Sequence, residues 1–294
     1  MARHLTVSSS HTKARSPADL LRVDPSLARR IISRFLRDSI RRHGFKGAII
    51  GLSGGLDSSV TALLAAEGLG AGSVRAVALP FRESDPASLH LAASVAEAAS
   101  IPLETVSITG MAAPYLASLP KSARRRRGNV LARLRMIVLY DLSARDQMLV
   151  VGTSNKTEIL LGYTTLHGDA ACALLPIGDL YKTQVRALAL HIGVPAPILE
   201  RPPSADLWKG QTDESELGFS YAAVDRLLVR MIDHRLPPDR LLEEGFDPAL
   251  IRRVRAMIRR SQFKRRFPPV AKLSHRTVGM DFRYSRDWDR WGSD

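Results

Sequence analysis

The sequence predicts an α/β fold, in which a doubly wound, mostly parallel sheet flanked by helices is followed by a helical C-terminal part. Three features indicate this fold. Short apolar runs alternate with amphipathic segments between residues 27 and 152, and a glycine-rich turn joins the first apolar run to a helix. Beyond about residue 200 the chain is polar and mainly of helical pattern, with prolines at 202, 203, 237 and 238. Such an alternation places helices on both faces of a parallel sheet.

The first expected helix spans residues 27–42, where apolar residues recur at four-residue spacing between arginines, and Gly44 ends it. The apolar positions are Leu27, Ile31 and Phe35, interleaved with Ile32, Leu36 and Ile40. Strands are expected at residues 48–52, 74–79, 103–108 and 148–152, and helices at residues 58–66, 87–99 and 131–142. We expect one domain over residues 20–275, a disordered basic tail at 1–19 and a second tail at 276–294.

Composition limits the class of protein. The chain has 294 residues, of which 45% are hydrophobic and 24% charged, as in globular proteins. No stretch approaches the roughly 20 apolar residues of a membrane span, and the polar, basic start lacks the apolar segment of a signal peptide, so we expect no membrane contact and a cytoplasmic location. Cys172 is the only cysteine, which excludes intramolecular disulfides, cysteine metal clusters and paired-thiol chemistry.

The net charge of +14 predicts attraction to anions: nucleic acid, an acidic membrane surface or phosphate-rich small molecules. Basic residues concentrate at 124–127, 252–260 and 264–266. Each run can also be a solvated segment that keeps the protein soluble. The run Arg124 to Arg127 is expected in a mobile loop, and the sequence assigns it no role.

Residues 51–59 (GLSGGLDSS) lie between an expected strand and an expected helix. Ligands of open parallel sheets bind beyond the carboxyl ends of the strands. Glycines there let backbone N–H groups face a phosphate, the helix N-terminus adds positive charge, and Asp57 can hold a magnesium ion that bridges phosphates. The bland alternative is a plain turn in which Asp57 or Ser58 caps the helix.

This loop resembles the Ser-Gly-Gly-x-Asp-Ser signature of the PP-loop ATP pyrophosphatases, which cut ATP between the α and β phosphates and have an adenine nucleotide alpha hydrolase-like fold. Four further stretches resemble the NAD synthetase family: residues 79–84 (LPFRES), 128–136 (GNVLARLRM), 152–169 (GTSNKTEILLGYTTLHGD) and 210–218 (GQTDESELG). The family converts deamido-NAD into NAD, using ATP, Mg²⁺ and ammonia or glutamine. The resemblance therefore implies a carbon–nitrogen ligase.

The resemblance assigns roles to individual residues. It implies ATP contacts at Gly51, Leu52, Ser53, Gly54, Gly55, Leu56, Asp57, Ser58, Arg82, Thr153, Lys182 and Ser204, deamido-NAD contacts at Arg133, Leu166, Ala173, Phe263 and Lys264, and catalytic roles for Asp57, Lys182 and Asp169. Leu166, Ala173, Ser204 and Phe263 depart from residues that some family members carry, so the contacts to the nicotinate side are the least defined.

Glu158 is the second expected magnesium ligand, because it lies one turn into a helix after a strand end and matches the metal ligand of the family. Its alternative is a capping box with Asn155. Lys182 is expected to offset charge on the leaving pyrophosphate, or else to be a surface residue at a helix start. Asp169 is expected to attract ammonium and help it lose a proton, or else to be a turn residue.

Many family members carry an added glutamine-cleaving domain with a catalytic cysteine, which would need roughly 100 to 200 further residues. Here the only cysteine, Cys172, lies inside the synthetase region. Free ammonia is therefore the expected nitrogen source, unless a separate partner protein supplies it. The resemblance also implies a homodimer. The closest alternative enzyme is a PP-loop tRNA-modifying ligase of the lysidine-forming type, which the positive charge favours but which gives no reason for residues 128–136 and 210–218. A non-enzymatic alternative is a basic nucleic-acid-binding protein on a degenerate synthetase scaffold. The retention of both Asp57 and Glu158 argues against such decay, and we expect no nucleic-acid partner.

Overall fold

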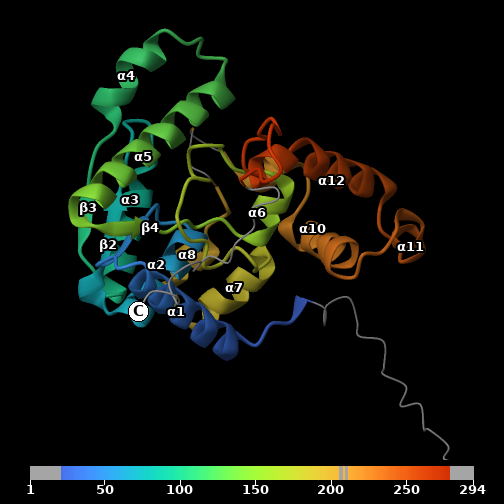
Figure 1. Cartoon of the computed structure of the whole chain (residues 1–294), viewed down its shortest axis with the longest axis horizontal. Coiled ribbons are helices and arrows are strands. Elements are labelled where there is room, and N and C mark those ends of the chain that lie inside the picture. Colours follow the sequence, from blue (N-terminus) through green and yellow to red (C-terminus); the bar gives the residue numbers. More distant parts are fainter. Residues whose placement is uncertain (1–20, 205–207, 209–210, 279–294) are drawn as a thin grey trace, which may run out of the picture.

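A computed structural model describes residues 21–204, 208 and 211–278 of the chain. Its sheet has four strands in the order β3-β2-β1-β4, and every neighbouring pair is parallel, with Ile50 of β1 in register with Ala76 of β2 (Figure 1). The strands are β1 (Gly47–Gly51), β2 (Val74–Ala78), β3 (Leu103–Thr105) and β4 (Met148–Val150). The predicted parallel α/β sheet is confirmed.

The helices that connect and follow the strands account for most of the remaining described chain. They are α1 (Pro25–Arg42), α2 (Leu56–Leu69), α3 (Pro86–Ala98), α4 (Thr109–Ala117), α5 (Arg124–Asp146), α6 (Lys156–Leu161), α7 (Lys182–His191), α8 (Ala196–Glu200), α9 (Asp213–Leu217), α10 (Tyr221–Leu228), α11 (Pro238–Glu243) and α12 (Pro248–Arg260), with short helices η2 (Ala71–Ser73), η3 (Val229–Asp233) and η4 (Gln262–Arg265). Among these helices none is long and apolar enough to cross a bilayer.

Side chains of the sheet pack on both faces because successive residues of a strand point to opposite sides. Ala48 and Ile50 of β1 join one apolar cluster with α1 and α2, to which Leu36 and Leu64 contribute. Ile49 faces the other way and joins a second cluster with α4 and α5. The two clusters make the sheet a buried layer between helices, as Figure 1 shows with α5 on one side and α1 and α2 on the other.

A third apolar cluster holds the C-terminal helices together. It contains Tyr181, which directly precedes α7, Tyr221 and Val224 of α10, and Val254 of α12, all at most 5% exposed. Leu161 at the end of α6 belongs to the same cluster, so the helical part packs directly against the helix that follows β4. This arrangement places α6, α7 and α10 beside one another.

Several element boundaries differ from the sequence predictions. The expectation that residues 124–127 form a mobile loop is wrong, because these arginines are the first turn of α5, and Arg127 Nη1 donates to the carbonyl of Leu116 over 2.8 Å. The third strand ends at Thr105, although backbone bonds from Val106 to Ala78 and from Ile108 to Pro80 continue the pairing. The predicted tail at 1–19, and residues 279–294 of the second tail, lie outside the described residues.

Candidate active site

A cavity of about 660 Å³ opens beyond the carboxyl ends of β1 and β4. This is the place where open parallel sheets bind ligands, and the volume suits a cofactor-sized molecule. The cavity is lined by all residues from Gly51 to Ser58 and by further residues that the sequence predicts for the site: Arg133, Thr153, Glu158, Leu166, Asp169, Lys182, Ser204, Phe263 and Lys264. Residues from seven separate segments of the chain therefore converge on one cavity.

The glycine-rich loop turns sharply between β1 and α2. Gly54 has φ +72°, and a Cβ there would collide with the carbonyl of Ser88 and with Leu91 of α3, so glycine is required at this position. Gly55 precedes α2, and no side chain caps this helix. The alternative in which Asp57 or Ser58 caps the helix is therefore wrong, and the first residues of α2 line the cavity.

Asp57 and Glu158 meet at the floor of the cavity, although 101 positions separate them in the sequence. Asn155 links them, because its Nδ2 donates to Asp57 Oδ1 over 3.0 Å and its Oδ1 accepts the backbone N–H of Glu158 over 3.1 Å. Glu158 Oε2 in turn accepts the backbone N–H of Asn155. The capping box is present, and it engages Oε2 of Glu158 only.

Lys182 provides the cation between the two carboxylates. Its Nζ donates to Asp57 Oδ2 and, over 3.3 Å, to Glu158 Oε1. Burial lowers the pKa of Lys182, but attraction to Asp57 and Glu158 outweighs it, so the pKa is raised and the ammonium stays charged. Lys182 is only 6% exposed. The expectation of an ordinary surface lysine is therefore wrong.

Burial raises the pKa of the Glu158 carboxyl, and Lys182 opposes that shift. The raised pKa, about 8, means that Glu158 adds a second negative charge to the cluster only when it is ionised. Two ionised carboxylates that share one ammonium carry one excess negative charge, which an added cation would neutralise.

The N-termini of α6 and α7 are fixed to each other by Asp225 of α10, which is fully buried. Asp225 accepts hydrogen bonds from Thr157 Oγ1 over 2.6 Å and from the backbone N–H of Thr183 over 2.9 Å. Thr157 also accepts the backbone N–H of Lys182 over 3.0 Å. Asp225 therefore sets the relative positions of Glu158 and Lys182. No sequence motif indicated this role, because Asp225 lies in an ordinary helical pattern.

A second group of predicted residues gathers around the turn at residues 162–169. Lys264 Nζ donates to the carbonyls of Gly162 and Thr164, and Arg133 Nε donates to that of Leu166 over 3.2 Å. Asp169 Oδ1 accepts the backbone N–H of Thr165 over 2.7 Å. Asp169 therefore stabilises the turn, which is the alternative role given for it from the sequence. It also lines the cavity.

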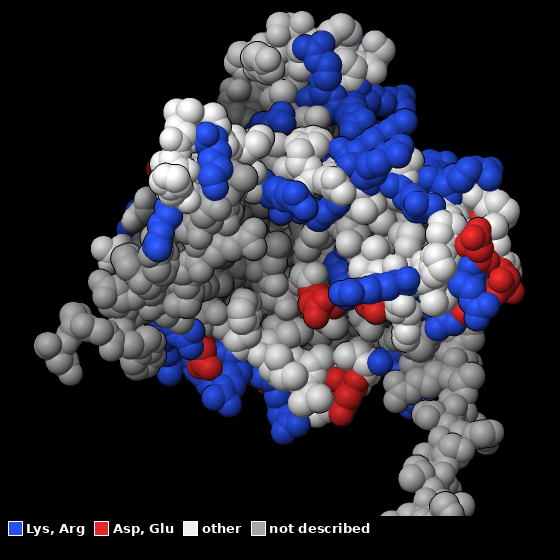
Figure 2. Space-filling model, turned by 45° about the vertical axis from the view of Figure 1, so that its right-hand side comes forward, with Lys and Arg blue, Asp and Glu red and all other residues white. Residues whose placement is uncertain are grey.

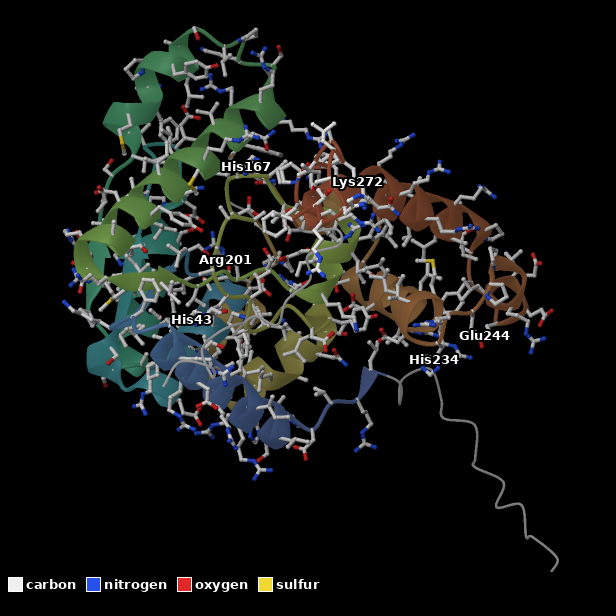
Figure 3. The ribbon with its side chains drawn as sticks, in the orientation of Figure 1. His43, His167, Arg201, His234, Glu244 and Lys272 are labelled. Carbon is white, nitrogen blue, oxygen red and sulfur yellow. The ribbon has the colours of Figure 1, made fainter. Side chains whose placement is uncertain are left out.

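Two predicted site residues do not line this cavity. Arg82 forms an ion pair with Glu83 at 3.7 Å and its side chain is 61% exposed, and Ala173 lies in the segment after the turn. Conversely, Arg201 lines the cavity without having been predicted; it donates to Ser88 Oγ over 3.0 Å and to Asp85 Oδ2 over 2.8 Å, and its position is labelled in Figure 3. No sequence motif singled it out.

Basic side chains gather around the hollow in the face that Figure 2 shows. The cavity lining includes Arg125, Arg133, Arg186 and Lys264. A site with this charge attracts phosphate-bearing ligands. Arg125, from the run without an assigned role, therefore reaches the edge of the site.

The parallel α/β sheet, the glycine-rich loop before an uncapped helix and the acidic pair with its lysine define a nucleotide-using α/β enzyme. A family model described as NAD synthase matches residues 28–268. The chain belongs to the NAD synthase family. It is a carbon–nitrogen ligase by that membership, and the tRNA-modifying alternative finds no support.

Individual relatives agree with this assignment. The chain is 50% identical to the NH₃-dependent NAD⁺ synthetase of Chlorobaculum tepidum over 91% of its own length and 97% of the relative's length. Among solved structures it resembles the NMN synthetase of Francisella tularensis, with 31% identity, a TM-score of 0.75 and coverage of 85% and 99% of the two chains. It also resembles the NH₃-dependent NAD synthetase of Campylobacter jejuni, with 30% identity, a TM-score of 0.72 and coverage of 85% and 100%.

Proposed function

We propose that the chain amidates the nicotinate carboxylate of deamido-NAD with ammonia at the expense of ATP, giving NAD, AMP and pyrophosphate. The observation that carries this proposal is the meeting of Asp57, Glu158 and Lys182 beside the glycine-rich loop. A phosphate-binding loop next to an acidic pair is the equipment that ATP cleavage requires. Relatives about half identical over nearly their full length carry the name of the ammonia-dependent enzyme.

The acidic pair fits Mg²⁺, which prefers carboxylate oxygens and keeps its other positions for water and phosphate. The described residues contain no group of three or more histidine, cysteine, aspartate or glutamate side chains suited to a metal. Because two carboxylates alone are few ligands for the ion, Asp57 and Glu158 would hold it together with the phosphates of ATP. A bound Mg²⁺ would neutralise charge on the departing pyrophosphate. Lys182, whose ammonium contacts both carboxylates in the ligand-free chain, would add its positive charge to that of the ion at the phosphates.

The reaction proceeds in two balanced steps. A carboxylate oxygen of deamido-NAD attacks the α-phosphorus of ATP. The bond between the α-phosphorus and the oxygen that bridges to the β-phosphate breaks, pyrophosphate departs, and an acyl-adenylate remains. Ammonia then attacks the acyl carbon, AMP leaves with the oxygen that made the first attack, and the nitrogen loses a proton. The backbone of residues 52–58 orients the phosphates, and Lys182 stabilises the charge that develops on them.

Asp169 is the candidate to receive the ammonium ion. It lies in the cavity wall, where its carboxylate accepts the backbone N–H of Thr165. A carboxylate attracts ammonium and accepts its proton before attack. Arg133 and Lys264, which hold the neighbouring turn, provide positive charge for the pyrophosphate of the dinucleotide.

A mononucleotide substrate is the second candidate, because the solved relative from Francisella tularensis is described as an NMN synthetase. Both substrates present the same nicotinate carboxylate, so the adenylation site does not separate them. They differ in the phosphate and adenosine that deamido-NAD carries in addition. Residues that contact this second half decide between them.

The test is to incubate the purified chain with ATP, MgCl₂ and NH₄Cl and either deamido-NAD or nicotinate mononucleotide, and to quantify NAD, NMN, AMP and ADP by chromatography. The proposal expects NAD and AMP in equal amounts and a kcat/KM for the dinucleotide that is higher by about 10-fold or more. NMN formation at the higher kcat/KM would replace the substrate assignment. ATP hydrolysis to ADP, or no amide product, would overturn the function. A glutamine-only control tests the nitrogen source.

Three further expectations belong to this proposal. Residues 20–275 would form one catalytic domain, which the match of the family model to residues 28–268 supports. The chain would work as a homodimer in the cytoplasm. Exposed apolar side chains on α4 and α5, namely Met111, Tyr115, Ile137 and Tyr140, support a self-association surface. Sedimentation velocity of the purified chain tests the dimer, and a single species of monomer mass would contradict it.

A further inference from the structure

Asp213, the first residue of α9, is a buried carboxylate that none of the predicted roles uses. It is 4% exposed and lines the cavity together with Asp57, Glu158 and Lys182. A buried carboxylate needs partners that compensate for its lost hydration. Its partners are side chains from two other segments, so its position links separate parts of the site.

Asp213 is bound by two tyrosine hydroxyls. Tyr221 of α10 donates to Asp213 Oδ2 over 3.1 Å, and the hydroxyl of Tyr163 lies 3.3 Å from Oδ1. The same Tyr163 hydroxyl lies 2.8 Å from Glu216 Oε2, so its single proton serves Asp213 or Glu216. The hydrogen bond from the Tyr221 hydroxyl is therefore the one that Asp213 does not share with Glu216.

Tyr221 connects Asp213 to the catalytic lysine. The Lys182 Nζ lies 5.2 Å from the centre of the Tyr221 ring, within the range of a cation–π contact. The Tyr221 side chain is buried and its hydroxyl end is held by Asp213. The ring thus forms one wall of the ammonium site, and the carboxylates of Asp57 and Glu158 bind the same ammonium.

Charge also connects these groups. The nearby Lys182 ammonium opposes the effect of burial on the Asp213 carboxyl, whose pKa is nevertheless raised. In turn Asp213 contributes, after Asp57 and Glu158, to the raised pKa of Lys182. The backbone N–H of Asp213 donates to the carbonyl of Pro203 over 2.9 Å, which fixes the carboxylate at the edge of the cavity.

We propose that Asp213 is a positioning residue, which fixes the Tyr221 ring through its hydroxyl and thereby holds Lys182 on Asp57 and Glu158 for the adenylation step. This role rests on the proposed function, and it acts on turnover rather than on binding of deamido-NAD. Loss of the Asp213–Tyr221 bond leaves the ring free to shift. Lys182 then loses one wall of its site and spends less time at the phosphates.

The test compares Asp213→Asn, Tyr221→Phe and the double variant, with Glu214→Gln as the matched control. Glu214 is the next residue of α9; it is exposed, and its Oε1 accepts the backbone N–H of Tyr221 over 2.8 Å, a bond that the glutamine carbonyl preserves. For Asp213→Asn and Tyr221→Phe we expect kcat to fall about 5-fold or more, with the KM for deamido-NAD within about 2-fold of the wild type. The control is expected to keep the wild-type kcat.

The double variant separates positioning from general loosening. If both residues act through one contact, the double variant has the kcat of the slower single variant, whereas independent effects multiply. Multiplying effects, or a smaller fall in kcat in both single variants, would overturn the proposal. If Asp213→Asn does not fold, as a melting curve would show, Tyr221→Phe alone decides by the same criterion, because it retains Asp213.

A ligand-free crystal structure of Tyr221→Phe provides a readout independent of turnover. The proposal expects the Lys182 ammonium to have left at least one of its two carboxylates, and an unchanged lysine would contradict it. The wild-type chain in the same assays distinguishes a failure of the proposed function from a failure of the role proposed for Asp213. Absence of NAD from the wild type would reject the proposed function, whereas an active wild type with unaffected variants would reject only the role of Asp213.

Discussion

Asn155 Nδ2 donates a 3.0 Å hydrogen bond to Asp57 Oδ1 and so joins the segments that follow β4 and β1. The two strands are neighbours in the sheet, which brings their carboxyl ends together. Glu158, three residues beyond Asn155, is thereby placed opposite Asp57. The acidic pair is a direct consequence of the strand order and of one amide side chain.

Neutral replacement of either carboxylate is expected to abolish most turnover. In Asp57→Asn and Glu158→Gln the side-chain size is kept, but the excess negative charge that would hold Mg²⁺ is lost. We expect kcat to fall about 100-fold or more, as for loss of a major electrostatic contact. We also expect the MgCl₂ concentration that gives half of the maximal rate to rise. Rates measured over a series of MgCl₂ concentrations check this. A variant with near wild-type rates at low MgCl₂ would show that the carboxylates do not bind the metal.

Removal of the lysine is expected to destabilise the ligand-free fold. Lys182→Met leaves two buried carboxylates without their cation, at a cost of about 3 kcal/mol. Melting temperatures without divalent ions should therefore fall, and MgCl₂ should raise that of the variant more than that of the wild type. Equal responses of both proteins to MgCl₂ would contradict the shared site. Lys156→Met, which removes an ion pair to Asp233 at 2.9 Å outside the acidic pair, is the control.

The destabilisation by Lys182→Met should also depend on pH. Burial already raises the pKa of Glu158, and loss of the lysine removes the main opposing influence. A carboxyl whose pKa is higher in the folded state binds its proton more tightly there, so stability decreases as pH rises from the unfolded pKa toward the folded one. The difference in melting temperature between variant and wild type is thus expected to narrow from pH 8 to pH 5. A difference that widens on acidification would be inconsistent with this sign.

Asp169→Asn is expected to affect ammonia use specifically. The amide oxygen can still accept the N–H of Thr165, so the turn is preserved, but the negative charge that attracts ammonium is lost. We expect the KM for NH₄Cl to rise about 10-fold, with the KM for ATP unchanged. Initial rates at varied NH₄Cl test this. Equal changes in both KM values would indicate a structural effect instead.

Cys172 is expected to react slowly with alkylating reagents. Burial raises the pKa of its thiol to about 11, so only about 1 molecule in 3,000 carries the reactive thiolate at pH 7.5. Iodoacetamide labelling, followed by mass spectrometry, should accelerate roughly 10-fold for each pH unit up to that value. Chain unfolded in urea serves as the reference. Labelling of the folded chain at the same rate as the unfolded reference would contradict the burial.

Much of the fold follows from short-range patterns. The apolar runs located all four strands, and β1 and β2 have the buried residues on both faces that are typical of a central parallel strand. The start of α5 was missed, since four arginines and Gly128 show no apolar periodicity, and the helix is held there by contacts such as that of Arg127 with Leu116. In α1, Leu27, Ile31 and Phe35 fit the helical period but are 37–58% exposed, because only one of the two apolar stripes faces the sheet.

The motifs located the centre of the site, but its supporting side chains could not be predicted. Asp57, Glu158 and Lys182 lie in recognisable segments, and the structure brings them into contact. Asp213 and Asp225 support them through bonds to Tyr221 and Thr157, which depend on how α9 and α10 pack against α6 and α7. The contact between Thr157 and Asp225 spans 68 positions, and that between Asp213 and Tyr221 joins two successive helices, so no local pattern specifies either contact.

The most direct test of the central claim follows one oxygen atom. Deamido-NAD labelled with ¹⁸O in its nicotinate carboxylate is converted with ATP, MgCl₂ and NH₄Cl, and the AMP is analysed by mass spectrometry. Attack of the carboxylate on the α-phosphorus predicts one ¹⁸O in each AMP released, and the remaining label in the NAD amide. Unlabelled AMP, or ADP as the nucleotide product, would contradict an acyl-adenylate formed between the glycine-rich loop and the acidic pair.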